Sequence, residues 1–153
     1  TMRYLDRSGL RAALDDLVVG QGKKALGICV GMQILADSSD EGELSGLGWI
    51  PGHVRRIDAD MLPSKPRLPH MGWNTVRLTR PSALLDQIDA VTGFYFLHSY
   101  YFDPADRDDV IATVEYGTGL TCAVNRGNVF GAQFHPEKSH GNGMAVFRNF
   151  ASL

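Results

Sequence analysis

The hydrophobic pattern at the start of the chain is helical. Between Leu10 and Val18 apolar residues recur at intervals of three and four positions, which predicts a helix with one buried stripe. That helix is expected to begin near Asp6 or Ser8 and to end at Gly20. The stripe consists of Leu10, Ala13, Leu14, Leu17 and Val18.

A strand, a tight turn and a second helix are predicted around Cys29. The apolar run 25–28 follows two lysines and has the length and composition of a buried parallel strand. After Cys29 the apolar residues return to helical spacing over 30–36. The polar, acidic stretch 38–45 predicts a solvated surface loop.

The second half of the chain is rich in short extended stretches. They lie around 48–57, 73–78, 94–102, 110–114 and 121–124, and a hairpin turn at 125–128 leads into 129–134. The last stretch, 143–153, is helical, and its spacing puts four apolar residues on one face: Met144, Phe147, Phe150 and Ala151. The order of elements predicts one layered α/β domain over residues 1–153.

Composition narrows the possible functions. With 153 residues, 44% of them hydrophobic, the chain is large enough for one domain with a core. A net charge of -2 gives no basic surface for nucleic acid or an anionic membrane, and no apolar run approaches the ~20 residues of a membrane span. Two cysteines are too few for a disulfide scaffold, so we expect a reducing, cytoplasmic compartment.

The pentapeptide 27–31, GICVG, has the pattern of a nucleophile elbow. A nucleophile on a sharp strand-to-helix turn needs small neighbours, which Gly27 and Gly31 provide. The helix that follows is expected to lower the pKa of Cys29 towards thiolate. The N–H of Val30 is expected to donate to a developing oxyanion. A buried structural cysteine is the competing interpretation of these five residues.

The segment 134–138, FHPEK, supplies the other parts of a cysteine acyl-transfer site. His135 follows an apolar strand and is the candidate base, since a thiol nucleophile needs a base within hydrogen-bond reach. Glu137 lies two residues further on, across Pro136, and is the candidate acceptor that orients the imidazole. Taken alone, these residues are also typical of a turn at the end of a strand.

Four motifs in order resemble the class I (triad) glutamine amidotransferases. GICVGMQIL and GAQFHPEKS resemble the family as a whole, whereas PHMGWN at 69–74 and YFLHSYYF at 95–102 resemble the glutaminase subunits of imidazole glycerol phosphate synthases. The resemblance covers nearly the whole chain. It implies a flavodoxin-like layered α/β domain, with a central, mostly parallel sheet flanked by helices.

The resemblance also implies roles for individual residues. Cys29 attacks the side-chain amide of glutamine, with His135 as base and Glu137 as its orienting partner. Gln33 holds the substrate, and the backbone of Ser99 and Tyr100 binds its α-carboxylate end. No metal and no cofactor are implied, and the other histidines have no metal-ligand spacing with Cys122.

A partner is implied as well. In this branch of the family the segment containing Met71, Gly72, Trp73 and Asn74 faces a synthase or cyclase subunit with a (β/α)8-barrel fold, which receives the ammonia. As a strand met in isolation, PHMGWN is also compatible with a core position for Trp73. Proline, glycine and two polar residues make it an unusual core strand and favour an interface.

The family pattern begins with a strand, a helix and a PGVG-like segment before the region that matches residues 2–10. The chain therefore resembles an N-terminally truncated domain, expected to be inactive or weakly active unless that oxyanion segment is supplied from elsewhere. Three alternatives remain open: a paralogous glutaminase for a synthase that amidates cell-surface sugars, a non-catalytic remnant that binds a partner, and a cysteine peptidase.

Overall fold

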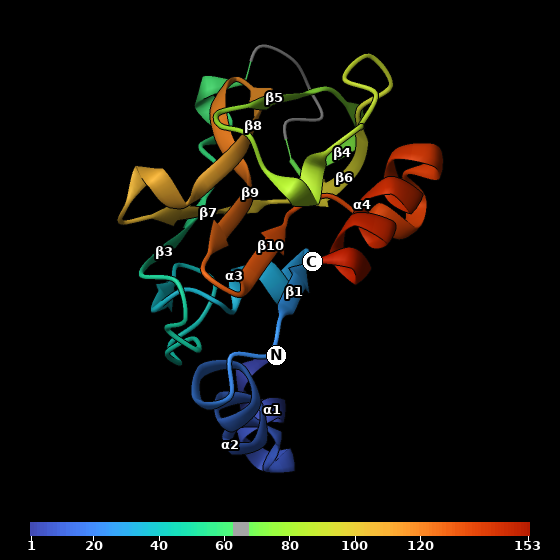
Figure 1. Cartoon of the computed structure of the whole chain (residues 1–153). Helices are drawn as coiled ribbons and strands as arrows, with labels where there is room; N and C mark the ends of the chain where they lie inside the picture. Colours follow the sequence, from blue (N-terminus) through green and yellow to red (C-terminus); the bar gives the residue numbers. More distant parts are fainter. Residues whose placement is uncertain (63–67) are drawn as a thin grey trace.

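The computed structural model describes residues 1–62 and 68–153 (Figure 1). The α-helices are α1 (Met2–Ser8), α2 (Leu10–Asp15), α3 (Val30–Gln33) and α4 (His140–Ser152), with a π-helical segment η1 (Asp16–Gly20). The 3-10 helices are η2 (Ala59–Met61), η3 (Ala83–Leu85), η4 (Arg107–Asp109) and η5 (Pro136–Lys138). The strands are β1 (Ala25–Ile28), β2 (Ser38–Ser39), β3 (Gly52–Arg56), β4 (His70–Asn74), β5 (Val76–Leu78), β6 (Phe94–His98), β7 (Tyr100–Pro104), β8 (Val110–Tyr116), β9 (Thr118–Arg126) and β10 (Val129–Ala132).

The main sheet has the order β1-β10-β9-β8-β5. Its β1–β10 pair is parallel, and the other three pairs are antiparallel. The predicted α/β class is confirmed, but the sheet is mixed rather than mostly parallel. The reason is local: two residues join β9 to β10, and such a short turn can only return the chain antiparallel. The parallel β1–β10 pair instead brings together segments about a hundred residues apart.

Two smaller sheets lie beside the main one, β2-β3-β7 and β4-β6. Both arise because a predicted strand divides: 94–102 separates at Ser99 into β6 and β7, and 73–78 separates at Thr75 into β4 and β5. Each half then joins a different sheet. A hydrophobicity pattern continues smoothly through such a bend and does not reveal it.

The core has two parts. The larger lies between the main sheet, the β4-β6 pair and α4. In it the ring of Phe134 stacks on Phe94 and meets Phe96 edge to face. The smaller surrounds α3, with Met32 and Phe102 fully buried. Together the two parts hold α3 against β1 and β10. Cys29 directly follows β1, and His135 follows β10.

The first predicted helix is interrupted, and the prediction of its buried stripe is wrong. Gly9, at φ 74°, ends α1 and separates it from α2. In the predicted stripe Val18 is buried, whereas Leu10 is 52% exposed and Leu17 is 41% exposed. Figure 1 shows α1 and α2, in blue, at the bottom of the view, below the sheets and apart from α4. Periodicity places residues on one face of a helix, but another element must cover that face to bury it.

The C-terminal helix α4 is confirmed and begins three residues earlier than predicted, at His140. Its buried face is made of small residues such as Ala145 and Val146. Met144 is 66% exposed and Phe147 is 37% exposed. Among the described residues no helix combines the length and the hydrophobicity needed to cross a bilayer.

Candidate active site

Cys29 sits on a sharp turn between β1 and α3. Its backbone angles, φ 52° and ψ -111°, are strained for a residue with a side chain. The Cys29 N–H donates to the Ala132 carbonyl of β10 at 2.8 Å, which ties the turn to the neighbouring strand. The predicted elbow is therefore present. Strain of this kind persists because the surrounding structure holds it in place.

The elbow depends on Gly27. A Cβ at this position would overlap the backbone of Gly31 and Met32, whereas a Cβ at Gly31 would meet nothing within 4 Å. We therefore expect Gly27→Ala to lower the free energy of unfolding by about 1–3 kcal/mol, the usual cost of overpacking a tight site. Urea denaturation followed by circular dichroism measures the change. Gly31→Ala is the matched control, and an equal loss of stability in both variants would contradict the packing argument.

The thiol is not activated in the way the sequence predicted. The pKa of Cys29 is raised above its ordinary value because burial disfavours the thiolate; the Val30 N–H, which hydrogen-bonds the sulfur, opposes this. The negative charges of Glu137 and Glu41 raise the pKa further, and Lys138 lowers it. The predicted net lowering of the pKa is wrong because burial outweighs the N–H of Val30, the first residue of the four-residue helix α3. A thiol with a raised pKa needs a base to remove its proton.

His135 lies at the same edge of the sheet as Cys29. The strands β1 and β10 run parallel, with Ile28 opposite Ala132, so the residues that follow them emerge at a common carboxyl edge. His135 Nδ1 is 2.7 Å from a carboxylate oxygen of Glu137, which lies in η5. Because a carboxylate only accepts, this contact puts the proton on Nδ1 and the lone pair on Nε2.

The His135 Nε2 atom is buried and has no hydrogen-bond partner among the residues that the structure describes. A buried polar atom without a partner is uncommon and needs a reason. Here the atom carries the lone pair of the candidate base. The atom is therefore available to accept a proton, and the Cys29 sulfur, which contacts the Leu97 carbonyl and the Gln133 amide, does not hydrogen-bond to it in this structure.

Gln33 and Tyr100 are brought together, although 67 residues separate them. The Gln33 amide nitrogen donates to the Tyr100 carbonyl at 3.0 Å and to the Gln133 side chain at 3.0 Å. The Gln133 amide in turn lies 3.7 Å from the Cys29 sulfur. Gln133 was missed in the sequence although it lies within GAQFHPEKS, because a single glutamine at the end of an apolar strand does not indicate a role. The Ser99 carbonyl accepts from the N–H of Ile57 at 3.0 Å.

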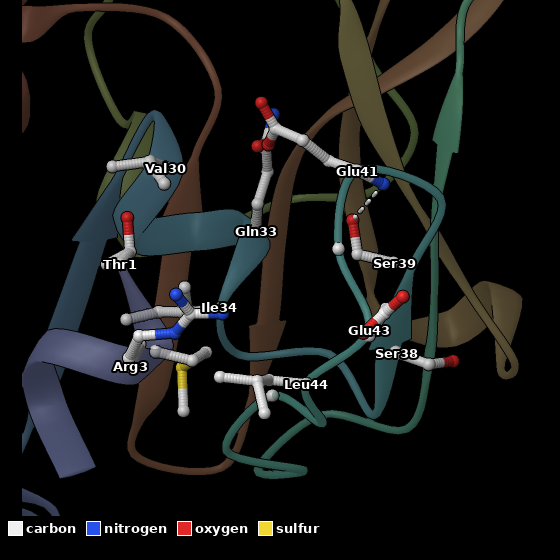
Figure 2. Close-up of a pocket in the computed structure, with 13 residues that line it drawn as sticks. Thr1, Arg3, Val30, Gln33, Ile34, Ser38, Ser39, Glu41, Glu43 and Leu44 are labelled. Atoms are coloured by element: carbon white, nitrogen blue, oxygen red, sulfur yellow. Dashed lines mark hydrogen bonds between the residues drawn. The ribbon is translucent and has the colours of Figure 1, made fainter.

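A cavity of about 510 Å³ opens beside α3 (Figure 2). Val30 and Gln33 form its wall on one side, and the loop with Glu41 and Glu43 lies opposite. This loop was predicted to be solvated. Glu41 and Glu43 are exposed, but they also line the cavity, and the charge of Glu41 raises the pKa of Cys29. An acidic stretch on a surface loop has no local signal that distinguishes such a position.

The HMGWN segment forms β4, and its side chains alternate. His70 is buried, Met71 is 63% exposed and Trp73 is 45% exposed, so Trp73 is not a core residue. The paired strand β6 presents Leu97 on the same outer face, opposite Met71. At the edge of α4, the ring of His140 stacks on Trp73 at 5.4 Å.

The backbone of β6 links this outer face to the catalytic residues. The Cys29 sulfur lies 3.8 Å from the Leu97 carbonyl, and the His135 N–H donates to the Tyr95 carbonyl at 2.9 Å. One strand therefore separates the exposed apolar surface from the candidate nucleophile and base.

The site and the fold define a class of protein. The family model for class-I glutamine amidotransferases matches residues 6–152, and the chain belongs to this family. It is 52% identical over 152 residues to the imidazole glycerol phosphate synthase subunit HisH of Leptospira borgpetersenii, covering 99% of this chain and 74% of that protein. The corresponding subunit of Leptospira interrogans is 53% identical, with the same coverage.

A solved structure supports the fold. A crystal structure of a glutamine amidotransferase superposes with a TM-score of 0.65 and covers 98% of this chain and 70% of its own. Its sequence identity is 17%, so this likeness bears on the fold alone.

Proposed function

We propose that this chain is a single glutaminase domain, the glutamine-hydrolysing subunit of an imidazole glycerol phosphate synthase in the cytoplasm. The observation that carries the chemistry is the geometry of His135. Its Nδ1 is held by Glu137, and its buried Nε2 is left for a proton. The assignment to histidine biosynthesis rests on 46–53% identity to HisH subunits over nearly the whole chain.

The proposed reaction follows from these positions. His135 removes the proton of the Cys29 thiol, and the sulfur attacks the γ-carbonyl carbon of glutamine. The Val30 N–H stabilises the oxyanion. The protonated His135 gives its proton to the departing nitrogen, which leaves as ammonia. A water molecule, deprotonated by His135, then hydrolyses the γ-glutamyl thioester to glutamate and restores the thiol.

The cavity beside α3 has groups that suit a free amino acid. Both N–H groups of Gln33 are used inside the protein, so its oxygen is the atom left to accept from the substrate. The Glu41 and Glu43 carboxylates suit an α-ammonium group. An α-carboxylate needs N–H donors, and we assign this contact to the backbone of Ser99 and Tyr100, which lies outside the lining of the cavity and contacts it through Gln33.

The partner surface is proposed to be the outer face of β4 and β6. A contiguous exposed apolar surface is typical of a protein interface. Met71, Trp73 and Leu97 supply it here, and Gly72 and Asn74 complete the strand. We propose that the partner is a cyclase subunit with a (β/α)8-barrel fold. Ammonia released at Cys29 would then have to pass only β6 to reach it.

Trp73→Ala should weaken binding of the cyclase subunit. An interface tryptophan typically contributes about 2 kcal/mol or more, which corresponds to an increase in Kd of ~30-fold. Isothermal titration of the chain with the cyclase subunit measures it. Leu78→Ala is the matched control, since Leu78 is 44% exposed on β5, in another sheet. Equal Kd values for the two variants would exclude β4 from the interface.

An assay of glutamate release, with and without the cyclase subunit and its phosphorylated imidazole precursor, tests the function. Glutamine hydrolysis that the cyclase stimulates supports the proposal. Absence of hydrolysis, together with binding of the cyclase, indicates a non-catalytic partner-binding chain. Stimulation by a sugar-amidating synthase alone indicates the paralogous pathway. Labelling of Cys29 by a peptide electrophile, but not by a glutamine analogue, indicates a peptidase.

A further inference from the structure

Two buried histidines form a hydrogen-bonded pair behind the substrate site. His70 of β4 is 3% exposed and His98 of β6 is 6% exposed. The Nδ1 atom of His70 lies 2.9 Å from Nε2 of His98. The His70 ring is stacked between Phe96 at 4.7 Å and Tyr116 at 4.0 Å, which fixes its plane. Neither histidine has a role in the proposed reaction.

The partners of this pair determine where each proton lies. His98 Nδ1 is 2.8 Å from the Tyr100 carbonyl, which only accepts, so Nδ1 of His98 carries a proton. In a neutral imidazole the other nitrogen, Nε2, then accepts, and the proton in the 2.9 Å contact belongs to His70 Nδ1. His70 Nε2 is left as an acceptor, and the Asn74 amide donates to it at 3.3 Å.

Both imidazoles must be neutral for this arrangement. If His98 were protonated, its Nε2–H would face the Nδ1–H of His70. Burial lowers the pKa of both residues to about 4; the charge of His98 adds to the effect on His70, and that of His135 adds to the effect on His98. The pair is therefore neutral near neutral pH.

The chain of hydrogen bonds continues to the nucleophile. The Tyr100 carbonyl accepts from His98 and also from Gln33, at 3.0 Å. Gln33 donates its second N–H to Gln133, whose amide is 3.7 Å from the sulfur of Cys29. The position of the Tyr100 carbonyl thus decides the orientation of the Gln33 amide.

The other end of this series of hydrogen bonds begins in β4. The Asn74 amide donates to His70 and also to the Glu115 carbonyl of β8 at 3.0 Å. The hydrogen bonds from β4 to the site therefore all run in one direction. Asn74 donates to His70, His70 donates to His98, and His98 donates to the Tyr100 carbonyl.

We infer that His70 and His98 are positioning residues for the proposed glutaminase, which hold the Tyr100 carbonyl where it orients Gln33 towards the substrate. The inference rests on the proposed function for its kinetic consequence. Its structural content, the direction of the hydrogen bonds and their effect on Gln33, does not depend on activity.

Two matched pairs of variants separate positioning from packing. In His98→Asn the side-chain amide nitrogen takes the place of Nδ1 and still reaches towards the Tyr100 carbonyl, whereas His98→Leu fills more of the volume and donates nothing. His70→Asn likewise retains a donor for His98, and His70→Leu does not.

Glutamine hydrolysis, measured in the presence of the cyclase subunit, should distinguish the leucine variants from the asparagine variants by their KM for glutamine. We expect both leucine variants to raise the KM for glutamine by ~10-fold, the effect of one buried hydrogen bond, with a smaller change in kcat. The asparagine variants should stay within about 3-fold of the natural chain. A packing role predicts the reverse order, because leucine replaces the volume of histidine better than asparagine does. That order would overturn the inference.

Nuclear magnetic resonance tests the same inference without an assay. Long-range ¹⁵N–¹H correlation in the unmodified chain should show His70 and His98 as neutral Nδ1–H tautomers from about pH 5.5 to pH 8, the range in which an ordinary histidine titrates. The side-chain amide signals of Gln33 should move in the leucine variants and remain in the asparagine variants. An Nε2–H tautomer of His98, or unmoved Gln33 signals in all four variants, would refute the positioning role.

Different results contradict the proposed function and the positioning role. A natural chain without glutaminase activity contradicts the proposed function, and the resonance measurements still decide the positioning role. An active natural chain with unchanged KM in the leucine variants contradicts the positioning role alone.

Discussion

Replacing Cys29 by alanine should abolish glutamine hydrolysis, with a loss in kcat of ~10⁵-fold or more, as for other nucleophiles that work in a triad. The sulfur is the atom that would form the thioester, and the Gln133 amide, the Val30 N–H and the Leu97 carbonyl contact it. Glutamate release in the presence of the cyclase subunit measures the loss. Unchanged folding should be verified by thermal melting, since the side chain of Cys29 lies outside both core clusters.

Cys122 provides the matched control for this prediction. It is the second free cysteine and is fully buried in the core, where burial raises its pKa above the ordinary range. A glutamine-analogue electrophile should therefore label the Cys122→Ala variant at Cys29 and leave the Cys29→Ala variant unlabelled. Retention of glutaminase activity in Cys29→Ala would refute the assignment of the nucleophile.

The second large effect is expected for His135→Asn. The Nε2 atom is lost, and the thiol, whose pKa is already raised by burial, no longer has a base. We expect kcat to fall by ~10⁴-fold or more, as when a triad loses its histidine. The remaining activity should rise with pH, because hydroxide alone then generates the thiolate, and it should still be rising above the ordinary cysteine pKa.

Glu137→Gln is the graded comparison for His135→Asn. Glutamine retains a hydrogen-bond acceptor near His135 Nδ1 but removes the negative charge that stabilises an imidazolium. Its loss in kcat should therefore be smaller than that of His135→Asn. The base assignment would be wrong if His135→Asn kept the natural pH profile and lost less activity than Glu137→Gln.

Some parts of the fold were predictable because their signals are local. The strand before Cys29, the turn at 125–128 and helix α4 follow from apolar runs, turn residues and helical spacing within a few positions. The divided strands were not predictable in this way. Ser99 and Thr75 lie where one apolar stretch passes from one sheet to another, and the choice between sheets is made by distant partners.

The buried faces of the helices show the same limit. The apolar periodicity of 10–18 and of 143–153 is real, yet Leu10, Met144 and Phe147 are exposed. In α4 the smaller residues Ala145 and Val146 face the core instead. Which of two apolar faces is buried depends on the shape of the surface it meets, and that surface is built from other parts of the chain.

By itself the sequence determined the family and the chemical groups of the site. A nucleophile elbow and a His-x-Glu turn are short motifs, in which the residues that act together are close along the chain or carry a recognisable spacing. The predicted contact between His135 and Glu137 is of this kind, two residues apart.

Only the tertiary structure decided how these groups are poised. Burial, rather than the short helix α3, sets the direction of the Cys29 pKa. Gln133 contacts the Cys29 sulfur across 104 residues of sequence, and the His70–His98 contact spans 28 residues. Glu41 follows Cys29 in a loop that lies across the cavity from α3 (Figure 2). Desolvation and long-range hydrogen bonds depend on what surrounds a side chain in space, and the order of residues along the chain does not contain that information in a local form.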